Sequence, residues 1–294
     1  MRPVHRLTAT ILIGCAVPVI AHGATLYVDP NGTCGGEAPC HTTIQAAVDA
    51  AVSGDTVKVS TGTYTGVTQK DVDGKTFHQV VFVDRSLSVI GGFTTADWTT
   101  PNPSANTTTV DAEGAGRPIT IFGDRTQSVA VSGLVLTGGD YSDLGNADGE
   151  YNAECARTSS DCGGGLFAKD VVLTVSDCLV TNNVASTTSY SSDGGGLYLW
   201  SVMDGSRVEN SVIVMNSSQL STSDGGGISL QRGSVTVSGC TIQGNHVGGD
   251  GGGFSAFQPD GPIIIEDTDF IENASEYRGG GVSTKLTYDG LGLT

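Results

Sequence analysis

Five runs of three glycines, each opening a short apolar stretch, constrain the fold of this chain more than any other feature. The runs are GGGLFA at 163–168, GGGLYL at 194–199, GGGISL at 225–230, GGGFSA at 251–256 and GGGVST at 279–284. After each of the first four runs, a second apolar stretch ends on an asparagine. These endings are VTNN at 180–183, IVMN at 213–216, IQGN at 242–245 and FIEN at 270–273.

The spacings divide each repeat into a constant part and a variable part. From the first glycine of a run to its asparagine the distance is 20, 22, 20 and 22 residues, whereas from the asparagine to the next run it is 11, 9, 6 and 6. Because strand side chains alternate with a period of two, an insertion of two residues leaves the same side chains facing inward. A constant coil joined by variable loops predicts a solenoid of stacked coils.

The composition fits short strands joined by tight turns. Glycine accounts for 43 of 294 residues, and only 15% of residues are charged, which is too little charge for a disordered acidic chain. The repeats lack helical periodicity. We therefore predict an all-β fold, a single-stranded right-handed parallel β-helix (solenoid), with a short N-terminal capping helix at 42–52, where Thr42 and Gln45 resemble a capping box.

Residues at the same place in successive coils should stack, because coils of a β-helix are about 4.8 Å apart. The repeat asparagines are then expected to form an internal hydrogen-bonded ladder, since an amide both donates and accepts. These are Asn183, Asn216, Asn245 and Asn273. The same register places Cys178 two coils from Cys240, beyond the roughly 7 Å that a disulfide spans, so we predict two buried free thiols.

The first 23 residues have the pattern of a secretory signal peptide. Arg2 and Arg6 precede an apolar run at 9–21, and Ala21-His22-Gly23 places small residues where an export peptidase cleaves. Leu12-Ile13-Gly14-Cys15 is an alternative, lipoprotein-type cleavage site. Either reading predicts an exported protein, secreted or on the cell surface.

The charge of the exported chain limits its partners. Without residues 1–23 it has 12 basic and 31 acidic side chains, a net charge of −19. Such a chain is a poor match for nucleic acid or an anionic membrane, and no later segment has the apolar length of a membrane span. A glycan or a protein surface remains the expected partner, with no required cofactor and with calcium as a candidate ligand.

The exported part is expected to divide into four regions. Residues 24–66 form an N-terminal cap and the first strands, 67–140 the early coils, 141–162 an acidic insertion, and 163–294 the Gly-triplet repeats. The cysteine spacing predicts one disulfide between Cys34 and Cys40, and another between Cys155 and Cys162 that closes the insertion. Because the chain stops soon after its fifth triplet, we expect either further sequence or a partner at the C-terminal end.

The chain resembles the pectin-lyase-like superfamily of right-handed parallel β-helices. TIQAAVDAAVSGDTVKVSTGTY at 43–64 is similar to the entry segment of its bacterial secreted members. The Gly triplets together with Phe270-Ile271-Glu272-Asn273 look like the repeats of polymorphic outer-membrane proteins, which are surface-exposed and adhesive. The resemblance covers nearly all of the exported chain and implies the fold, but many chemistries share this scaffold.

Several residues are candidates for chemistry at the loop edge. Asp193, Asp224 and Asp250 each precede a Gly triplet and should stack, which makes them either turn residues or a calcium site. Lys169 and Arg232 occupy nearly equivalent turns, where each is a candidate lyase base or a solvated turn residue. The aromatic residues Tyr190, Tyr198 and Trp200 are candidates for stacking on sugar rings.

Two classes of function follow from these features. The first is a secreted or cell-surface β-helix repeat protein with an adhesive, glycan-binding or structural role. The second is a polysaccharide lyase or glycoside hydrolase that acts on acidic polysaccharide. The aspartate pair and His-Gly step that polygalacturonases use are missing, since no two aspartates are adjacent and His246 is followed by Val247. We therefore favour the non-enzymatic class.

Overall fold

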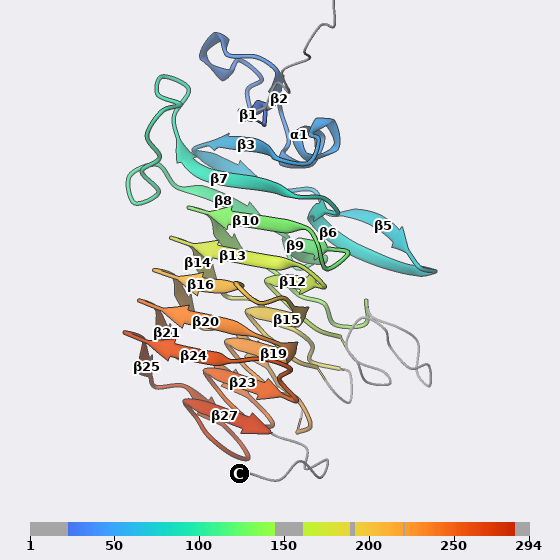
Figure 1. Ribbon diagram of the computed structural model, residues 1–294, viewed down its shortest axis with the longest axis vertical. Helices are drawn as coiled ribbons and strands as arrows, with labels where there is room; N and C mark the ends of the chain where they lie inside the picture. The colour runs from blue at the N-terminus through green and yellow to red at the C-terminus, as the bar shows by residue number, and fades with distance from the viewer. Residues whose placement is uncertain (1–22, 145–160, 189–191, 220, 286–294) are drawn as a thin grey trace, which may run out of the picture.

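The computed structural model describes residues 23–144, 161–188, 192–219 and 221–285. In this part of the chain, three long sheets run side by side along a stack of coils, and nearly every strand pair is parallel. The N-terminal cap lies at one end of the stack and the last coil at the other (Figure 1). The fold is the predicted parallel β-helix.

From β3 (Asp55–Ser60) onward, each coil contributes one strand to each long sheet, and the hairpin strand β5 (Thr68–Val72) is an addition to sheet C. In sequence order, sheet A contains β1 (Thr25–Val28), β2 (Cys40–His41), β3 (Asp55–Ser60), β7 (Leu87–Phe93), β10 (Ser128–Ser132), β13 (Val172–Ser176), β16 (Arg207–Glu209), β20 (Val235–Ser238) and β24 (Ile263–Glu266). Sheet B contains β4 (Gly62–Tyr64), β8 (Thr108–Asp111), β11 (Val135–Thr137), β14 (Leu179–Thr181), β17 (Val212–Val214), β21 (Thr241–Gln243) and β25 (Asp269–Ile271).

The remaining strands follow sheet B in each coil and complete it. Sheet C contains β5 (Thr68–Val72), β6 (Lys75–Val83), β9 (Arg117–Phe122), β12 (Leu166–Lys169), β15 (Leu197–Val202), β19 (Ile228–Gly233), β23 (Phe254–Phe257) and β27 (Val282–Lys285). A short sheet D contains β18 (Ser217–Ser218), β22 (His246–Val247) and β26 (Ala274–Ser275).

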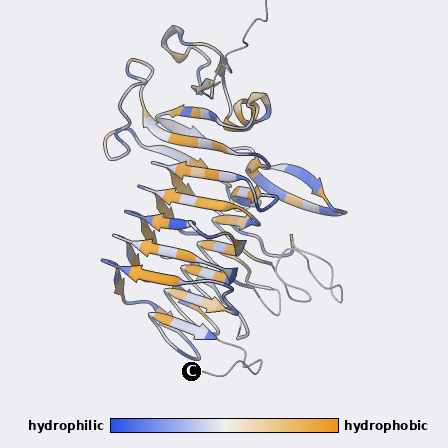
Figure 2. Ribbon diagram, viewed as in Figure 1, coloured by the Kyte–Doolittle hydropathy of each residue, from blue (hydrophilic) through white to orange (hydrophobic). Residues whose placement is uncertain are grey.

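The core is a column of apolar side chains enclosed by the three long sheets. Alternate residues of each strand point inward, as in β13, where Leu173 and Val175 are buried and their neighbours are partly exposed. The same positions point inward in successive coils, since Val175 pairs with Val131 and Val208. The apolar centres of the strands appear in orange in Figure 2.

Each of the three positions of a glycine triplet requires glycine for a different reason, as the third run shows. Gly225 has a positive φ of 71°, which glycine adopts without steric cost. A Cβ on Gly226 would lie 2.6 Å from the carbonyl oxygen of His246, and one on Gly227 would lie 2.6 Å from that of Gly253. The triplets therefore permit close backbone approach where sheet C begins.

A short helix, α1 (Ile44–Ala50), closes the N-terminal end of the core. Its N-cap is Thr43, whose hydroxyl accepts a hydrogen bond from the Ala46 amide, so the capping box expected at Thr42 is wrong. Gln45 instead accepts a hydrogen bond from the Phe82 amide at 2.6 Å. The helix buries an apolar face that comprises Ile44, Ala47, Val48 and Ala51.

An antiparallel hairpin departs from the parallel stack, and the sequence analysis missed it. Strands β5 and β6 pair from Thr68 with Gln79 to Val72 with Lys75. Their turn is Asp73-Gly74, where both residues have positive φ. Asp-Gly is a strong hairpin signal, and it was present in a region that we assigned to ordinary coils. The hairpin projects from the side of the stack (Figure 1).

The cysteines follow the predicted pattern as far as the structure describes them. Cys34 and Cys40 form a disulfide, and Cys178 and Cys240 are buried free thiols. Burial raises the pKa of Cys178 to about 12 and also raises that of Cys240, so both are inert thiols. Cys162 is disulfide-bonded, but its predicted partner Cys155 lies outside the described residues.

Two further predictions concern the ends and the membrane. The proposed signal segment lies outside the described residues. Among the residues that are described, no helix is both long enough and apolar enough to cross a membrane.

Candidate functional site

The repeat asparagines form a buried ladder along the corner that follows sheet B. The side-chain amide of Asn183 donates to Asn216 Oδ1 at 3.0 Å, and that of Asn216 donates to Asn245 Oδ1 at 3.0 Å. Asn245 donates in the same way to Asn273, at 2.9 Å. The second N–H of each amide donates to a backbone carbonyl of the coil before it. With its hydrogen bonds used internally, the ladder is structural.

The three pre-triplet aspartates form a second internal row. Asp193, Asp224 and Asp250 are each only 2% exposed. Asp193 accepts a hydrogen bond from the Asp224 amide at 2.8 Å, and Asp224 accepts one from the Asp250 amide at 3.1 Å. The row is therefore buried beneath the loops and is not on the surface.

A lysine from the last strand supplies the cation for this row. Lys285 Nζ lies 2.9 Å from Asp224 Oδ1 and 2.7 Å from Asp250 Oδ2. Burial alone lowers the pKa of Lys285, but its bonds to Asp250 and Asp224 outweigh this effect and raise it. Within the described ranges, no three His, Cys, Asp or Glu side chains are grouped to hold a metal ion. Calcium binding by these aspartates stays a prediction.

The aromatic residues outside sheet C divide into a buried layer and a partly exposed one. Tyr198 is fully buried, and its ring stacks on Phe167 with centroids 5.7 Å apart. It therefore offers no ring face to a ligand, contrary to our expectation, because the first glycines of two triplets, Gly163 and Gly194, lie close to it. Tyr190 lies outside the described residues.

Trp200 belongs to a column that crosses successive coils on the outer side of sheet C. Strand register aligns its members in the order Phe122, Lys169, Trp200, Gln231, Phe257 and Lys285. We call these six residues the outer column. Lys169 Nζ lies 4.8 Å from the Trp200 ring and 5.6 Å from the Phe122 ring, which are cation–π distances. A cation held between two partly exposed rings is the strongest candidate for a binding surface.

The two candidate lyase bases are not equivalent in the structure. Lys169 aligns with Gln231 through Trp200, so Arg232 is one residue further along. The ammonium of Lys169 also lies 3.9 Å from Asp170. Arg232 is exposed and has a positive φ of 62°. These two basic side chains therefore occupy different environments.

A buried arginine that the sequence analysis did not single out anchors the start of the repeats. Arg117 is fully buried, and its guanidinium lies 3.3 Å from the ring centre of Tyr141. It donates to the carbonyl oxygens of Cys162 and Gly163 at 2.6–2.9 Å. Only the fold brings residues 117, 141 and 162 together, so no local motif marks this cluster.

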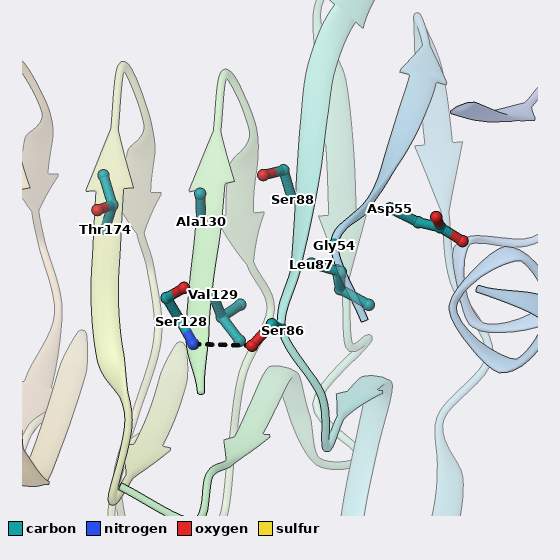
Figure 3. A pocket seen from close by; sticks show the side chains of 9 residues that line it. All are labelled: Gly54, Asp55, Ser86, Leu87, Ser88, Ser128, Val129, Ala130 and Thr174. Atoms are coloured by element: carbon teal, nitrogen blue, oxygen red, sulfur yellow. Dashed lines mark hydrogen bonds between the residues drawn. The ribbon is translucent and has the colours of Figure 1, made fainter. Parts of the chain in front are cut away.

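The shallow hollows on the molecule differ in the side chains that line them. One, of about 270 Å³, lies on the outer face of sheet A and is lined mainly by small side chains such as Ser88, Ala130 and Thr174. Figure 3 shows these side chains in separate strands, with one hydrogen bond from the Ser128 amide to Ser86. The lining of this hollow contains no cationic side chain. A hollow beside the β5–β6 hairpin has two, Lys70 and Arg85.

Comparison with known proteins adds one structural likeness. No protein-family model matches the sequence, and no curated protein matches it either. The crystal structure of pectate lyase Pel9A is similar to 91% of this chain and to 77% of its own chain, with 12% sequence identity and a TM-score of 0.33.

Proposed function

We propose that this protein is an exported, secreted or surface-displayed β-helix that binds acidic glycans through the outer column without cleaving them. The observation that carries the proposal is the ammonium of Lys169, 4.8 Å from the partly exposed Trp200 ring. An aromatic face stacks on sugar rings and an ammonium pairs with a sugar carboxylate, so together they suit an acidic saccharide.

The arrangement of the column supports a linear ligand. Its members recur once per coil, about 4.8 Å apart, and they alternate between aromatic, cationic and amide side chains. A polymer lying along the stack meets a partly exposed group at each coil except that of Gln231, which is only 3% exposed. The remainder of the protein is strongly acidic. Lys169 supplies the positive charge of the column for an acidic polymer, since Lys285 is paired with Asp224 and Asp250.

Export and display belong to the same proposal. Residues 1–23 serve as the signal peptide, and the Cys34–Cys40 disulfide suits an oxidising compartment. The resemblance of the triplet repeats to polymorphic outer-membrane proteins supports adhesion at the cell surface. The four regions expected from the sequence form part of this proposal.

The direct test is binding of acidic and neutral polysaccharides to the wild type and to Trp200→Ala, with Tyr277→Ala as a matched control. Tyr277 is an aromatic residue with 69% of its surface exposed, and it lies outside the column. We expect Trp200→Ala to weaken binding at least about tenfold, as loss of a stacking anchor does, and Tyr277→Ala to leave it unchanged. Equal effects of both changes contradict the proposal.

The enzymatic alternative is tested on the same samples. Incubation of the wild type with the acidic polysaccharides that it binds, with and without Ca²⁺, is followed for unsaturated and reducing ends. We expect neither to form. Turnover that is lost in Lys169→Met or Asp224→Asn replaces the binding proposal with a lyase or hydrolase.

A further inference from the structure

A polar pocket lies between helix α1 and the β5–β6 hairpin, away from the glycine triplets. Its volume is about 250 Å³, and its lining includes Gln45, Asp49, Lys70, Gln79, Phe82 and Arg85. Figure 2 shows the hairpin as a largely hydrophilic projection from the stack. Gln69 and Asp84 also line the pocket, so five amide or carboxylate side chains and two cations surround one hollow beside an aromatic ring.

Gln79 gives this pocket a buried hydrogen-bond acceptor that has no partner. The residue is fully buried, and its amide nitrogen donates to the Thr68 carbonyl oxygen at 3.3 Å. In the described part of the protein, its Oε1 atom has no donor. A buried acceptor left without a donor destabilises the fold. A hydroxyl donor from a ligand in the pocket removes this effect.

Lys70 gives the pocket an available positive charge. Its ammonium lies 5.5 Å from the centre of the Phe82 ring, and among the described residues it forms no ion pair. The other charged groups of the pocket are already engaged. Arg85 pairs with Asp84 at 2.9 Å, and Asp49 accepts from Gln45 at 2.8 Å. An anionic group on a ligand is therefore expected to pair with Lys70.

A second hollow adjoins the first and extends it. It has a volume of about 190 Å³, shares Gln45 and Thr68 with the first, and adds Thr42, Thr63 and Thr65. Each hollow is smaller than the roughly 300 Å³ at which ligand pockets begin, and the two lie side by side. The added hydroxyls are donors and acceptors that match a second sugar unit better than they match an apolar group.

From this combination we infer that the hairpin pocket binds a saccharide unit that carries one anionic group, either a carboxylate or a sulfate. The anionic group pairs with Lys70, a sugar hydroxyl donates to Gln79 Oε1, and the second hollow receives a neighbouring sugar. This site is separate from the outer column, although the Phe82 ring also stacks on Phe122 with centroids 6.0 Å apart. The inference therefore goes beyond the proposed function.

The test uses the full chain and small probes, followed by titration calorimetry and by the amide resonances of Gln45 and Gln79. The probes are glucuronate, glucose 6-sulfate, glucose, acetate and inorganic sulfate. We expect the two anionic sugars to bind at least about tenfold more tightly than glucose or the two simple anions, because only they use both the cation and the acceptor.

Two lysine variants on the same hairpin localise the site. Lys70 is exposed, so Lys70→Gln leaves the fold intact, and we expect it to lower the affinity for the anionic sugars about tenfold, to that of glucose. Lys75→Gln makes the same charge change outside the pocket lining and is expected to have no effect. Gln79→Met removes the acceptor and is expected to weaken glucose and the anionic sugars alike.

Four results overturn the inference. They are acetate or sulfate binding as tightly as the anionic sugars, equal losses in Lys70→Gln and Lys75→Gln, no shift of the Gln79 amide, and no binding of any sugar. The separate role of the outer column is checked with Trp200→Ala, which should lose polysaccharide but keep the anionic monosaccharides. If Trp200→Ala loses both, the small probes bind the outer column and the hairpin site is rejected.

Discussion

The coils before residue 140 and the coils after residue 160 solve the same stacking problem by different means. At the corner after sheet B, the later coils each place a buried asparagine, whereas the preceding coil has Gly139 there. The early coils have the helix, the Cys34–Cys40 disulfide and the projecting hairpin. The later coils have glycine triplets and two polar rows.

This difference shows which interactions fix the register between neighbouring coils in each half. In the later coils, each asparagine side chain accepts from the coil before it, and those of Asn183, Asn216 and Asn245 donate to the coils on both sides. A slip of one residue therefore breaks a series of buried bonds. In the early coils, apolar packing and the cap fix the chain, and side chains vary more from coil to coil. Repeated interior residues thus mark structural constraint, whereas outward positions of the same coils vary from coil to coil, as in the outer column.

The largest expected effect comes from breaking the ladder in its middle. Asn216→Ala removes an amide that bonds Asn183, Asn245 and the Val180 carbonyl, leaving several buried groups unsatisfied. We expect a loss of about 4 kcal/mol in the free energy of unfolding, measured by chemical denaturation. The exposed Asn102 of the early half serves as control, and Asn102→Ala should cost less than about 1 kcal/mol. Equal losses contradict a special role for the ladder.

The next effect compares two triplets at their third glycine. A Cβ on Gly227 would lie 2.6 Å from the Gly253 carbonyl oxygen, whereas the nearest atom to one on Gly281 is 3.7 Å away. We expect Gly227→Ala to destabilise by about 3 kcal/mol through overpacking, and Gly281→Ala by less than about 1 kcal/mol. Thermal unfolding of both variants measures the difference. If Gly227→Ala is no less stable than Gly281→Ala, close packing is not the reason for the triplet.

A smaller and pH-dependent effect is expected at Lys285. Lys285→Met leaves Asp224 and Asp250 without their shared cation, and we expect a loss of about 2 kcal/mol after allowing for partial exposure. Because the pKa of Lys285 is raised by the fold, its contribution is complete below the unfolded value of about 10.4. The contribution disappears as pH rises through the folded pKa. Denaturation at pH 7 to 11 tests this, and a gap between wild type and variant that is independent of pH contradicts it.

The smallest expected effect concerns His78 in the hairpin. Its contribution to stability is lost as pH falls, whereas that of Lys285 is lost as pH rises. Burial, and secondarily the charge of Arg117, lowers the pKa of His78. Its stabilising contribution is therefore complete above the unfolded value of about 6.5, and it is lost as pH falls through the lower folded value. We expect the wild type to lose stability relative to His78→Gln between pH 7 and pH 5. Parallel pH profiles of the two proteins refute this assignment.

Sequence periodicity predicted the later coils well because their structural residues recur at fixed spacing. The triplets, the asparagine ladder and the free thiols Cys178 and Cys240 all follow from stacking equivalent positions. Burial of Asp224 beneath Lys285 did not follow, because residues 61 positions apart meet there. The Gln79 pocket was also missed, although Asp73-Gly74 marked the hairpin, because its chemistry arises where the hairpin meets helix α1.

Measuring binding and stability on one protein, Trp200→Ala, tests the central claim most directly. The claim is that the repeated interior serves the fold and that the outer column binds glycan. We predict that Trp200→Ala loses acidic-polysaccharide binding at least about tenfold, while its free energy of unfolding changes by less than about 1 kcal/mol. Unchanged binding with a large loss of stability would show that Trp200 serves the fold, and would contradict the claim.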